Sequence, residues 1–405
     1  MKKLILHILV FLASAVPVFA ELTWTSAAPM LTPRVGHCAA VSGGKIYVFG
    51  GAVMRRENET FSTSIEAYDP TEDSWTEVGQ LPRGISQAAA LTIGNYIYIF
   101  GGLTAEGPSR EVNRFDPQTN RIDQRGRLPE PRIAMAVVAN HGRILMIGGI
   151  TNRQEFTSGG YWFEPDSNRW IEAPEMNQPR ASFGLVSDSL IWAIGGVYLG
   201  PSNRVEVFRN NAWAEVPRGN LPEPRGEMGT AFLNDTTLVT AGGITRGGTT
   251  NSVIAYSVRS GMWRRLPPLN SERASFPLIA LDNKLYAIGG GRHGGDRMGG
   301  MMADVQVLAE VNATPFEPVI PSTPKLMQIP IWPNPGNGRF SFDLPAHGSG
   351  IEIWDQTGRL IYTNPITQYG LWIWDAGDLP ASAYQIRITD RLGKPVGEGR
   401  AVLAR

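Results

Sequence analysis

Short apolar runs that end in two adjacent glycines recur six times along this chain. The pairs are Gly50-Gly51, Gly101-Gly102, Gly148-Gly149, Gly195-Gly196, Gly242-Gly243 and Gly289-Gly290. Successive pairs are separated by 51 residues once and then by 47 residues four times. A fixed period of this length indicates stacked copies of one supersecondary unit, because no copy buries its apolar faces alone.

One period, from Pro131 to Met176, shows what the unit contains. Four short apolar segments are separated by His141-Gly142, by Gly148-Gly149 with its polar loop, and by the turn residues 165–168. Short apolar segments bounded by such residues predict strands. Each period is therefore expected to form one four-stranded antiparallel sheet.

Each unit carries an arginine before its first strand, and most carry an aromatic residue in the third. The arginines are Arg34, Arg83, Arg132, Arg180, Arg225 and Arg273, and the aromatic residues are Tyr68, Phe115, Phe163, Phe208 and Tyr256. A tryptophan follows seven residues later at Trp75, Trp170 and Trp263. These rings are expected to fill the space between neighbouring sheets, while Gly-Gly permits a sharp turn and close strand approach.

The sixth unit has no tryptophan after its third strand, and the missing strand is predicted at the other end of the chain. Trp24 precedes Arg34 by 10 residues, the spacing that Trp170 keeps to Arg180. We therefore expect residues 22–25 to complete the sixth sheet. This pairing would leave no exposed sheet edge. The predicted fold class is all-β, with a six-bladed β-propeller closed by an N-terminal strand and followed by a small C-terminal β-sandwich.

The repeated residues resemble the kelch repeat family. The resemblance rests on Pro-Arg, on Gly-Gly, on an aromatic residue with an acidic neighbour (Tyr68-Asp69, Phe115-Asp116) and on the spaced tryptophan, and it covers residues 22 to about 311. Ile122 replaces the tryptophan of the second unit, and Glu272 replaces the proline before Arg273. The resemblance implies a propeller over residues 21–311.

The ends of the chain predict export. Lys2-Lys3, an apolar stretch and the small-residue site Val18-Phe19-Ala20 are typical of a signal peptide over residues 1–20. We expect no membrane-spanning segment in the mature chain, and a secreted or cell-surface location. The single cysteine, Cys38, excludes an internal disulfide, and its apolar surroundings favour a packed side chain.

Residues 312–328 carry regularly spaced prolines, which predict an extended linker. Alternating strands then indicate a small β-sandwich over residues 329–405. This segment resembles the type A sorting domain of the type IX secretion system. The residues that carry the resemblance include Pro333, Asn334, Pro335, Gly338, Asp355, Gly358, Arg359 and Tyr384. The resemblance implies passage through the periplasm and outer membrane, with the type IX machinery as a partner.

Strand alternation places the loop before each Pro-Arg and the loop after each Gly-Gly on one face of the propeller. The six arginines are therefore expected to ring the channel mouth, although each also has a structural reason to belong to its repeat. A glycine-rich loop on the same face adds Arg292, His293 and Arg297 as candidate ligand contacts. A solvated insertion and a soft-metal site are the alternatives for this loop.

Composition limits the possible functions. Lys plus Arg equals Asp plus Glu at 37 each, which argues against a nucleic-acid partner. No residue spacing indicates a metal, a cofactor or a catalytic triad. We therefore expect a secreted or cell-surface module that binds a glycan or a protein. Two alternatives remain: a structural adhesion component, and a carbohydrate-active enzyme of the sialic-acid epimerase kind, in which Glu227 would be the acid/base.

Overall fold

The computed structural model describes residues 21–55, 58–217, 219–294, 297–311, 327–328, 331, 339–344, 350–357, 359–365, 370–376, 379–389 and 395–403. The described elements are strands, and no helix occurs among them. The chain divides into two compact units, Met1–Ala313 and Thr314–Arg405.

The first unit contains six four-stranded antiparallel sheets, one for each Gly-Gly repeat. Sheet 1 is β2 (Cys38–Ser42), β3 (Lys45–Phe49), β6 (Ser64–Asp69) and β7 (Ser74–Gln80). Sheet 2 is β8 (Ala89–Ile93), β9 (Tyr96–Phe100), β12 (Glu111–Asp116) and β13 (Arg121–Arg127). Sheet 3 is β15 (Ala136–Asn140), β16 (Arg143–Ile147), β18 (Gly160–Glu164) and β19 (Arg169–Ala173).

The other three sheets repeat this order. Sheet 4 is β20 (Gly184–Ser187), β21 (Ile191–Ile194), β22 (Val205–Arg209) and β23 (Ala212–Glu215). Sheet 5 is β24 (Gly229–Asn234), β25 (Thr237–Ala241), β28 (Val253–Ser257) and β29 (Met262–Leu266). Sheet 6 is β30 (Leu278–Leu281), β31 (Lys284–Gly294), β32 (Arg297–Val311) and β1 (Glu21–Ala27).

The N-terminal strand occupies the fourth position of sheet 6. β1 pairs antiparallel with β32, and Trp24 lies opposite Leu308. The predicted pairing of residues 22–25 with the end of the sixth unit is confirmed. The two ends of the repeat region are therefore hydrogen-bonded in one sheet.

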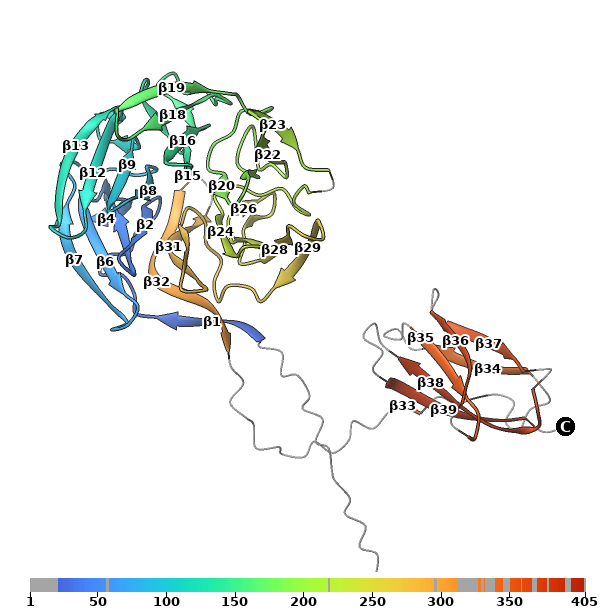
Figure 1. Ribbon diagram of the computed structural model, residues 1–405. Helices are drawn as coiled ribbons and strands as arrows, with labels where there is room; N and C mark the ends of the chain where they lie inside the picture. The colour runs from blue at the N-terminus through green and yellow to red at the C-terminus, as the bar shows by residue number, and fades with distance from the viewer. Residues whose placement is uncertain are drawn as a thin grey trace, which may run out of the picture. The chain divides into compact units, whose positions relative to one another are not determined.

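The six sheets follow one another around a common centre, with the first strands inside and the fourth strands outside (Figure 1). Each first strand contacts the first strand of the next sheet, and β30 contacts β2. The second strands are apolar runs buried on both faces, since a sheet packs on each side of them. The apolar core is thus divided into clusters that join neighbouring sheets, and one of these places Tyr68 of sheet 1 against Tyr286 of sheet 6.

Short ladders lie at the ends of the sheets from which the Gly-Gly loops emerge. They are β4 (Ala52–Arg55) with β5 (Asn58–Phe61), β10 (Leu103–Thr104) with β11 (Gly107–Pro108), β14 (Arg132–Ile133) with β17 (Ile150–Thr151), and β26 (Ile244–Thr245) with β27 (Gly248–Thr249). Each unit also pairs the segment after its arginine position with the residues after Gly-Gly, as Val35 pairs with Ala52. The predicted common location of these loops is confirmed, and we call this side the loop face.

The second unit has seven described strands in two sheets. One sheet runs β33 (Met327–Gln328), β39 (Pro395–Leu403), β38 (Ser382–Thr389), β35 (Gly350–Trp354) and β36 (Leu360–Pro365). The other pairs β34 (Arg339–Leu344) with β37 (Gly370–Asp375). Phe340 of β34 shares one buried cluster with Ile353 and Ile386 of the larger sheet.

Candidate functional site

Five of the six repeat arginines that were predicted as site residues are buried. Arg34, Arg132, Arg180, Arg225 and Arg273 are only 0–1% exposed. In each, Nη1 donates to the carbonyl oxygen of the first glycine of its own Gly-Gly pair, at 2.7 to 3.2 Å. The expectation that these side chains ring the channel mouth is wrong, because they are enclosed by the loops that they hold together.

Carboxylates balance most of these buried charges. Arg34 pairs with Glu66, Arg132 with Glu130, Arg180 with Glu206 and Arg273 with Asp304. Arg225 differs: Nη2 donates to Ser252 Oγ at 2.7 Å, and Glu223 is 3.8 Å away. Burial lowers the pKa of the Arg225 guanidinium, while the negative charge of Glu223 opposes this shift. Each guanidinium therefore has a structural role within its own unit.

The second repeat, which forms sheet 2, departs from this scheme. The Gly51 amide donates to the Ile85 carbonyl, the same contact that the Gly102 amide makes with Arg132. Ile85 therefore occupies the position of the buried arginine. Arg83 lies two residues earlier, its side chain is 48% exposed, and it pairs with Glu111 at 3.2 Å and Glu106 at 3.8 Å. Among the six repeat arginines, Arg83 is thus the exposed one.

Six backbone amides form a closed hydrogen-bonded circuit around the centre of the first unit. The contributing residues, one per sheet, are Gly36, Gln87, Ala134, Ser182, Glu227 and Ser275, and we call them the mouth ring. Each amide donates to the carbonyl of the preceding member at 2.7 to 2.9 Å, and Gly36 donates to Ser275. All six have positive φ, between 48° and 65°. This left-handed conformation is unusual for residues other than glycine, asparagine and aspartate.

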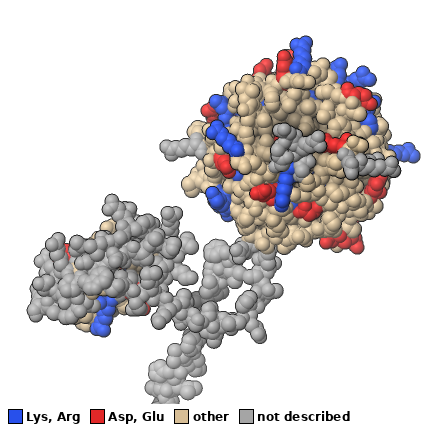
Figure 2. All heavy atoms as spheres, turned by 180° about the vertical axis from the view of Figure 1, so that it is seen from behind, with Lys and Arg blue, Asp and Glu red and all other residues tan. Residues whose placement is uncertain are grey.

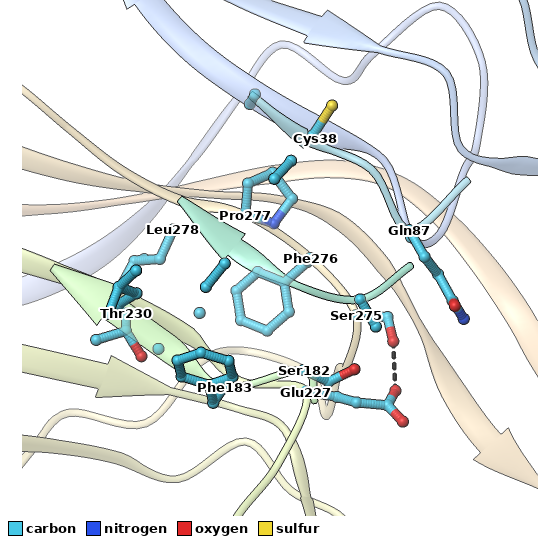
Figure 3. A pocket seen from close by; sticks show the side chains of 18 of the residues that line it. Cys38, Gln87, Ser182, Phe183, Glu227, Thr230, Ser275, Phe276, Pro277 and Leu278 are labelled. Atoms are coloured by element: carbon cyan, nitrogen blue, oxygen red, sulfur yellow. Dashed lines mark hydrogen bonds between the residues drawn. The ribbon is translucent and has the colours of Figure 1, made fainter. Parts of the chain in front are cut away.

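A cavity of about 310 Å³ extends from the mouth ring along the first strands (Figure 3). Its walls are mostly small or apolar, including Phe183, Phe276 and Leu278. Glu227 is the sole carboxylate among the described lining residues, and no lysine or arginine occurs among them. Ser275 Oγ donates a hydrogen bond to the Glu227 carboxylate, and Figure 3 shows Ser182 beside them.

His37 and Cys38 belong to the cavity wall but are not poised for chemistry. Burial, together with the positive charge of Arg34, lowers the pKa of the His37 imidazole to about 3. Burial raises the pKa of the Cys38 thiol to about 12. Both side chains are therefore neutral near pH 7, which agrees with the packed side chain predicted for Cys38.

Apolar side chains lie on two neighbouring loops of the loop face, where Phe156 and Tyr198 are half-buried and Leu199 is exposed. Phe156 and Tyr198 make an edge-to-face contact with ring centroids 5.7 Å apart. Leu199, next to Tyr198, is 89% exposed and has a φ of 55°. We call these three residues the apolar tip. Sequence reasoning did not identify it, because the two loops share no repeated motif.

The glycine-rich segment after Gly289-Gly290 forms an extension of the β31–β32 hairpin. Pairing continues through Arg292↔Gly299 to Gly294↔Arg297, after two register shifts. The segment is therefore a strand pair rather than the expected irregular loop. Arg292 is exposed, whereas the side chains of His293 and Arg297 lie outside the described part of the structure.

Surface charge on the first unit is mixed in sign. Figure 2 shows basic and acidic side chains interspersed over the face that it presents. Within the described residues, no group of three or more His, Cys, Asp or Glu side chains is placed to hold a metal ion. No helix in the described part of the chain has the length and hydropathy to cross a bilayer.

Three of the predicted sorting residues lie in the described part of the second unit. Asp355 Oδ1 accepts hydrogen bonds from the Thr357 and Arg359 amides at 2.9 and 3.0 Å. The Thr357 hydroxyl and these amides lower the pKa of Asp355 to about 2. The buried Tyr384 donates its hydroxyl to the Pro380 carbonyl at 2.7 Å. Pro333, Asn334, Pro335, Gly338 and Gly358 lie outside the described residues.

Repeated four-stranded antiparallel sheets, with no helix among the described residues, define the first unit as a β-propeller-like repeat structure. Sequence comparison narrows this class. A family model described as the KLHDC2/KLHL20/DRC7 Kelch-repeats domain matches residues 18–196. The match covers less than half of the chain and shows that this part is similar to kelch-repeat domains.

Similar curated proteins include several with kelch in their names. Beta-scruin of Limulus polyphemus is 28% identical over 192 residues, which are 44% of this chain and 20% of that protein. Kelch-like protein 25 of Xenopus tropicalis is 30% identical over 183 residues, 43% of this chain and 31% of that protein. Kelch-like protein 23 of Mus musculus is 26% identical over 208 residues, 49% of this chain and 35% of that protein. The chain thus spans 20–35% of the length of these relatives.

Proposed function

We propose that residues 21–311 form a closed six-bladed kelch propeller that binds a protein partner through its loop face. The pairing of β1 with β32 and the closed circuit of mouth-ring hydrogen bonds support closure. The kelch repeats support protein binding. Loops held on a rigid scaffold are the usual carriers of binding in such folds.

The apolar tip is the observation that carries this proposal. A leucine that is 89% exposed, beside a packed Phe156–Tyr198 pair, exposes apolar surface without stabilising the fold. Leu199 also adopts a left-handed backbone conformation, which costs energy for an L-residue that carries a Cβ. Aromatic residues near an exposed aliphatic side chain are typical of the anchors on which protein interfaces depend.

The test is a selection of displayed proteins and peptides on the purified full chain. Binders are expected to lose affinity at least tenfold for Tyr198→Ala and Leu199→Asp. Met262→Asp is the matched control, because Met262 is 67% exposed but starts a fourth strand, at the end of sheet 5 opposite the loop face. Binders whose affinity is unchanged by both Tyr198→Ala and Leu199→Asp would contradict the proposal. A glycan array run in parallel tests the glycan ligand that the sequence left open.

Glu227 offers little support for the epimerase alternative. Proton transfer between two faces of a sugar carbon requires a second acid or base near the first. The described cavity lining contains one carboxylate and the neutral His37. Arg225, two residues before Glu227, is buried and donates to Gly242 and Ser252. Binding therefore remains the better-supported function.

We further propose that the chain is exported to the cell surface or medium, with residues 1–20 as signal peptide and 329–405 as type IX sorting domain. Two features of the sequence support this proposal: an N-terminus typical of a signal peptide, and sorting motifs that follow one another along the chain as in the sorting-domain family. Removal of residues 329–405 is expected to leave the folded propeller in the periplasm of a host with this system. Normal appearance of the truncated chain in the medium would contradict the sorting role.

A further inference from the structure

A cavity lies between the neighbouring sheets 3 and 4 (Figure 1), at the ends of their strands opposite the loop face. Its volume is about 510 Å³, and its described walls come from the β15–β16 turn, from β18 and β19, and from the β22–β23 turn. We call this cavity the junction groove. The lining residues that matter here are Asn140, Arg143, Trp162, Ile171, Phe208 and Asn211.

The junction of sheets 6 and 1 shows how such a space can be closed. There the Asp73 carboxylate, in the turn between β6 and β7, accepts hydrogen bonds from the Ala28 amide and the Tyr68 hydroxyl, at 2.8 and 2.7 Å. The Trp75 indole donates to the Ala28 carbonyl at 2.9 Å across the same junction. The turn of sheet 1 is thereby fastened to the preceding sheet.

Sheet 4 lacks the groups that make these bonds. Pro174 takes the place of Ala28, because the Trp213 indole donates to its carbonyl at 3.1 Å, but proline has no amide hydrogen. Phe208 takes the place of Tyr68 and has no hydroxyl group. The turn is also two residues shorter, because Trp213 follows Phe208 by five residues and the interval in sheet 1 is seven. The sequence of sheet 4 therefore leaves the junction groove open.

Arg143 gives the groove a positive charge that is paired with no described carboxylate. Its side chain is exposed, and its guanidinium carbon lies 4.9 Å from the centre of the Trp162 ring. The nearby Glu164 carboxylate accepts hydrogen bonds from Ser167 and Arg169 instead, at 3.0 and 3.2 Å. A guanidinium stacked on an aromatic ring keeps the donors at its edge available for a planar acceptor.

Glu172 is the carboxylate residue of the described lining, and its side chain belongs to the other face of sheet 3. It lies opposite Tyr161 in the β18–β19 ladder, and Tyr161 packs in the cluster that joins sheets 2 and 3. Burial raises the pKa of the Tyr161 hydroxyl, and the negative charges of Glu130 and Glu172 add to the increase. Trp162 packs in the cluster of sheets 3 and 4, since successive side chains of a strand point to opposite faces.

Uncharged donors in the groove also lack partners among the described residues. Trp162 is only 6% exposed, yet its indole nitrogen donates to no described group. A buried indole N–H usually has an acceptor. The side-chain amides of Asn140 and Asn211 are likewise unpaired within the described part of the chain. The fold does not require a tryptophan here, because the same position in sheets 4 and 5 holds Val207 and Ala255.

We propose that the junction groove binds a small apolar carboxylic acid. The carboxylate accepts hydrogen bonds from the edge of the Arg143 guanidinium, in the bidentate geometry that these two planar groups favour. The apolar body packs against Ile171 and Phe208, in a cavity of the size that small ligands occupy. The groove and the apolar tip lie at opposite ends of the sheets, so this site goes beyond the proposed protein binding and does not depend on it.

Other ligands match the groove less well. A phosphate group carries a charge of about −1.5 to −2 near pH 7, whereas the described lining has one arginine, one exposed histidine (His141) and no lysine. A basic ligand would be repelled by Arg143. A sugar acid would press hydroxyl groups against Ile171 and Phe208, where they would lose hydrogen bonds to water.

The test measures the binding of simple compounds to the purified full chain by calorimetry. The probes are phenylpropionate, hexanoate, acetate, glucuronate and the neutral alcohol phenylpropanol. We expect phenylpropionate and hexanoate to bind at least tenfold more tightly than acetate, which lacks the apolar body, and than the alcohol, which lacks the charge. Their binding should weaken as salt is added.

The indole signal of Trp162 reports where the acid binds. In protein with ¹⁵N-labelled tryptophan, this signal is assigned by its loss in Trp162→Phe. Phenylpropionate should shift it. The indole of Trp263, which donates to the Gly219 carbonyl at another junction and is assigned in the same way, should not shift.

Arg143→Gln is expected to remove at least tenfold of the phenylpropionate affinity. Arg143→Lys keeps the charge without the planar pair of donors, and should retain only part of the affinity. Arg153→Gln is the matched control, because Arg153 is an exposed arginine of the third repeat, on the loop face and outside the groove lining.

A longer turn provides a variant that leaves Arg143 in place. Replacing Asn210-Asn211 by Pro-Thr-Glu-Asp, the sequence of residues 70–73 in sheet 1, restores the seven-residue interval. This change should close the groove and abolish phenylpropionate binding.

Several outcomes would overturn the proposal. They are no binding of either apolar acid, equal binding of acetate or of the alcohol, tighter binding of glucuronate, an unshifted Trp162 signal, unchanged affinity in the longer-turn variant, and equal losses in Arg143→Gln and Arg153→Gln. Failure of the protein-display selection would count against the proposed function alone, because the apolar tip and the described groove lining share no residue.

Discussion

The indole nitrogen of Trp24 donates a hydrogen bond to the carbonyl oxygen of Pro267, 2.9 Å away and 243 residues later in sequence. Pro267 directly follows the fourth strand of sheet 5. Trp75, Trp213 and Trp263 make the same contact with the residues that follow the fourth strand of the preceding sheet, at 2.9 to 3.1 Å. Trp24 therefore behaves as the fourth-strand tryptophan of sheet 6, although its strand is the first of the described chain.

Loss of the Trp24 ring is expected to destabilise the first unit strongly. Trp24 is 6% exposed and packs with Leu285 and Leu308 in a cluster shared by sheets 5 and 6. Trp24→Ala should lower the free energy of unfolding by about 3–5 kcal/mol, as measured by denaturant titration. Ser26→Ala is the control, because Ser26 is an exposed residue of the same strand. Equal stability of the two variants would contradict the role given to β1.

The Arg180–Glu206 pair is expected to be costly to break, because both side chains are 0–1% exposed. Glu206→Gln should destabilise by about 3 kcal/mol or more, since the Arg180 charge would stay buried without a carboxylate. Glu215→Gln breaks an exposed pair with Arg204, which directly precedes β22 of sheet 4, and should cost less than about 1 kcal/mol. Thermal unfolding of both variants measures the difference.

Sheet 2 suggests how such a pair can be replaced. Ile85 stands in the arginine position, and the buried Asn113 stands where sheets 1 and 4 carry Glu66 and Glu206, two residues before the aromatic residue. The double change Arg180→Ile with Glu206→Asn is therefore expected to be more stable than Glu206→Gln alone. A double variant less stable than the single variant would refute this compensation.

His37 is expected to make the first unit sensitive to acid. Its folded pKa of about 3 lies below the ordinary value of 6.5, so the unfolded chain binds the extra proton between these values. The contribution of His37 is fully present above pH 6.5 and is lost as pH falls toward 3. Within this window, stability should fall by about 1.4 kcal/mol per pH unit from this group.

The variant His37→Met tests this origin, because Met135 and Met228 hold the equivalent positions, one residue after the mouth ring, in sheets 3 and 5. Chemical denaturation at several pH values should show a smaller acid loss than in the unaltered protein. The exposed His141 supplies the control variant His141→Gln, against which the pH profile of His37→Met is compared. An unchanged pH profile in His37→Met would rule out His37 as the source.

The second glycine of each pair is expected to resist substitution. An added Cβ at Gly243, where φ is 96°, would lie 2.5 Å from the Gly226 carbonyl oxygen. Gly248 has a φ of 105° and nothing within 4 Å of an added Cβ. Alanine at either site should lower the free energy of unfolding by about 1–2 kcal/mol through backbone strain. At Gly243 the steric clash should lower it by about 1–3 kcal/mol more. Denaturant titration that finds equal losses would contradict the steric argument.

The sequence predicted the sheets well because each unit repeats its turns and aromatic residues. The spacing of Trp24 to Arg34 also predicted the pairing with the sixth unit, since a missing strand leaves a recognisable gap. The location of Arg83 was harder to predict, because Pro82-Arg83 copies the repeat motif. Arg83 precedes Gly101 by 18 residues, whereas Arg34 precedes Gly50 by 16, and that spacing was the available signal.

Burial of the arginines depended on partners that the motif alone did not reveal. Glu66 and Glu206 stand two residues before Tyr68 and Phe208, on strands that otherwise bury apolar side chains. Acidic residues at such positions indicate a buried cation. The ion pairs of Glu66 and Glu206 could therefore have been predicted from the sequence. The apolar tip could not, because Phe156 and Tyr198 lie on loops of different units and meet only in the folded structure.

The register of β1 against β32 has a mechanical consequence. Glu21 lies opposite Val311, so the chain enters and leaves the repeat region at one point. A pull between these two residues would load the pairing from its end, and its hydrogen bonds would break one after another like a zipper. Tension applied at these two residues would therefore open this pair of strands one hydrogen bond at a time rather than shear all of its hydrogen bonds at once.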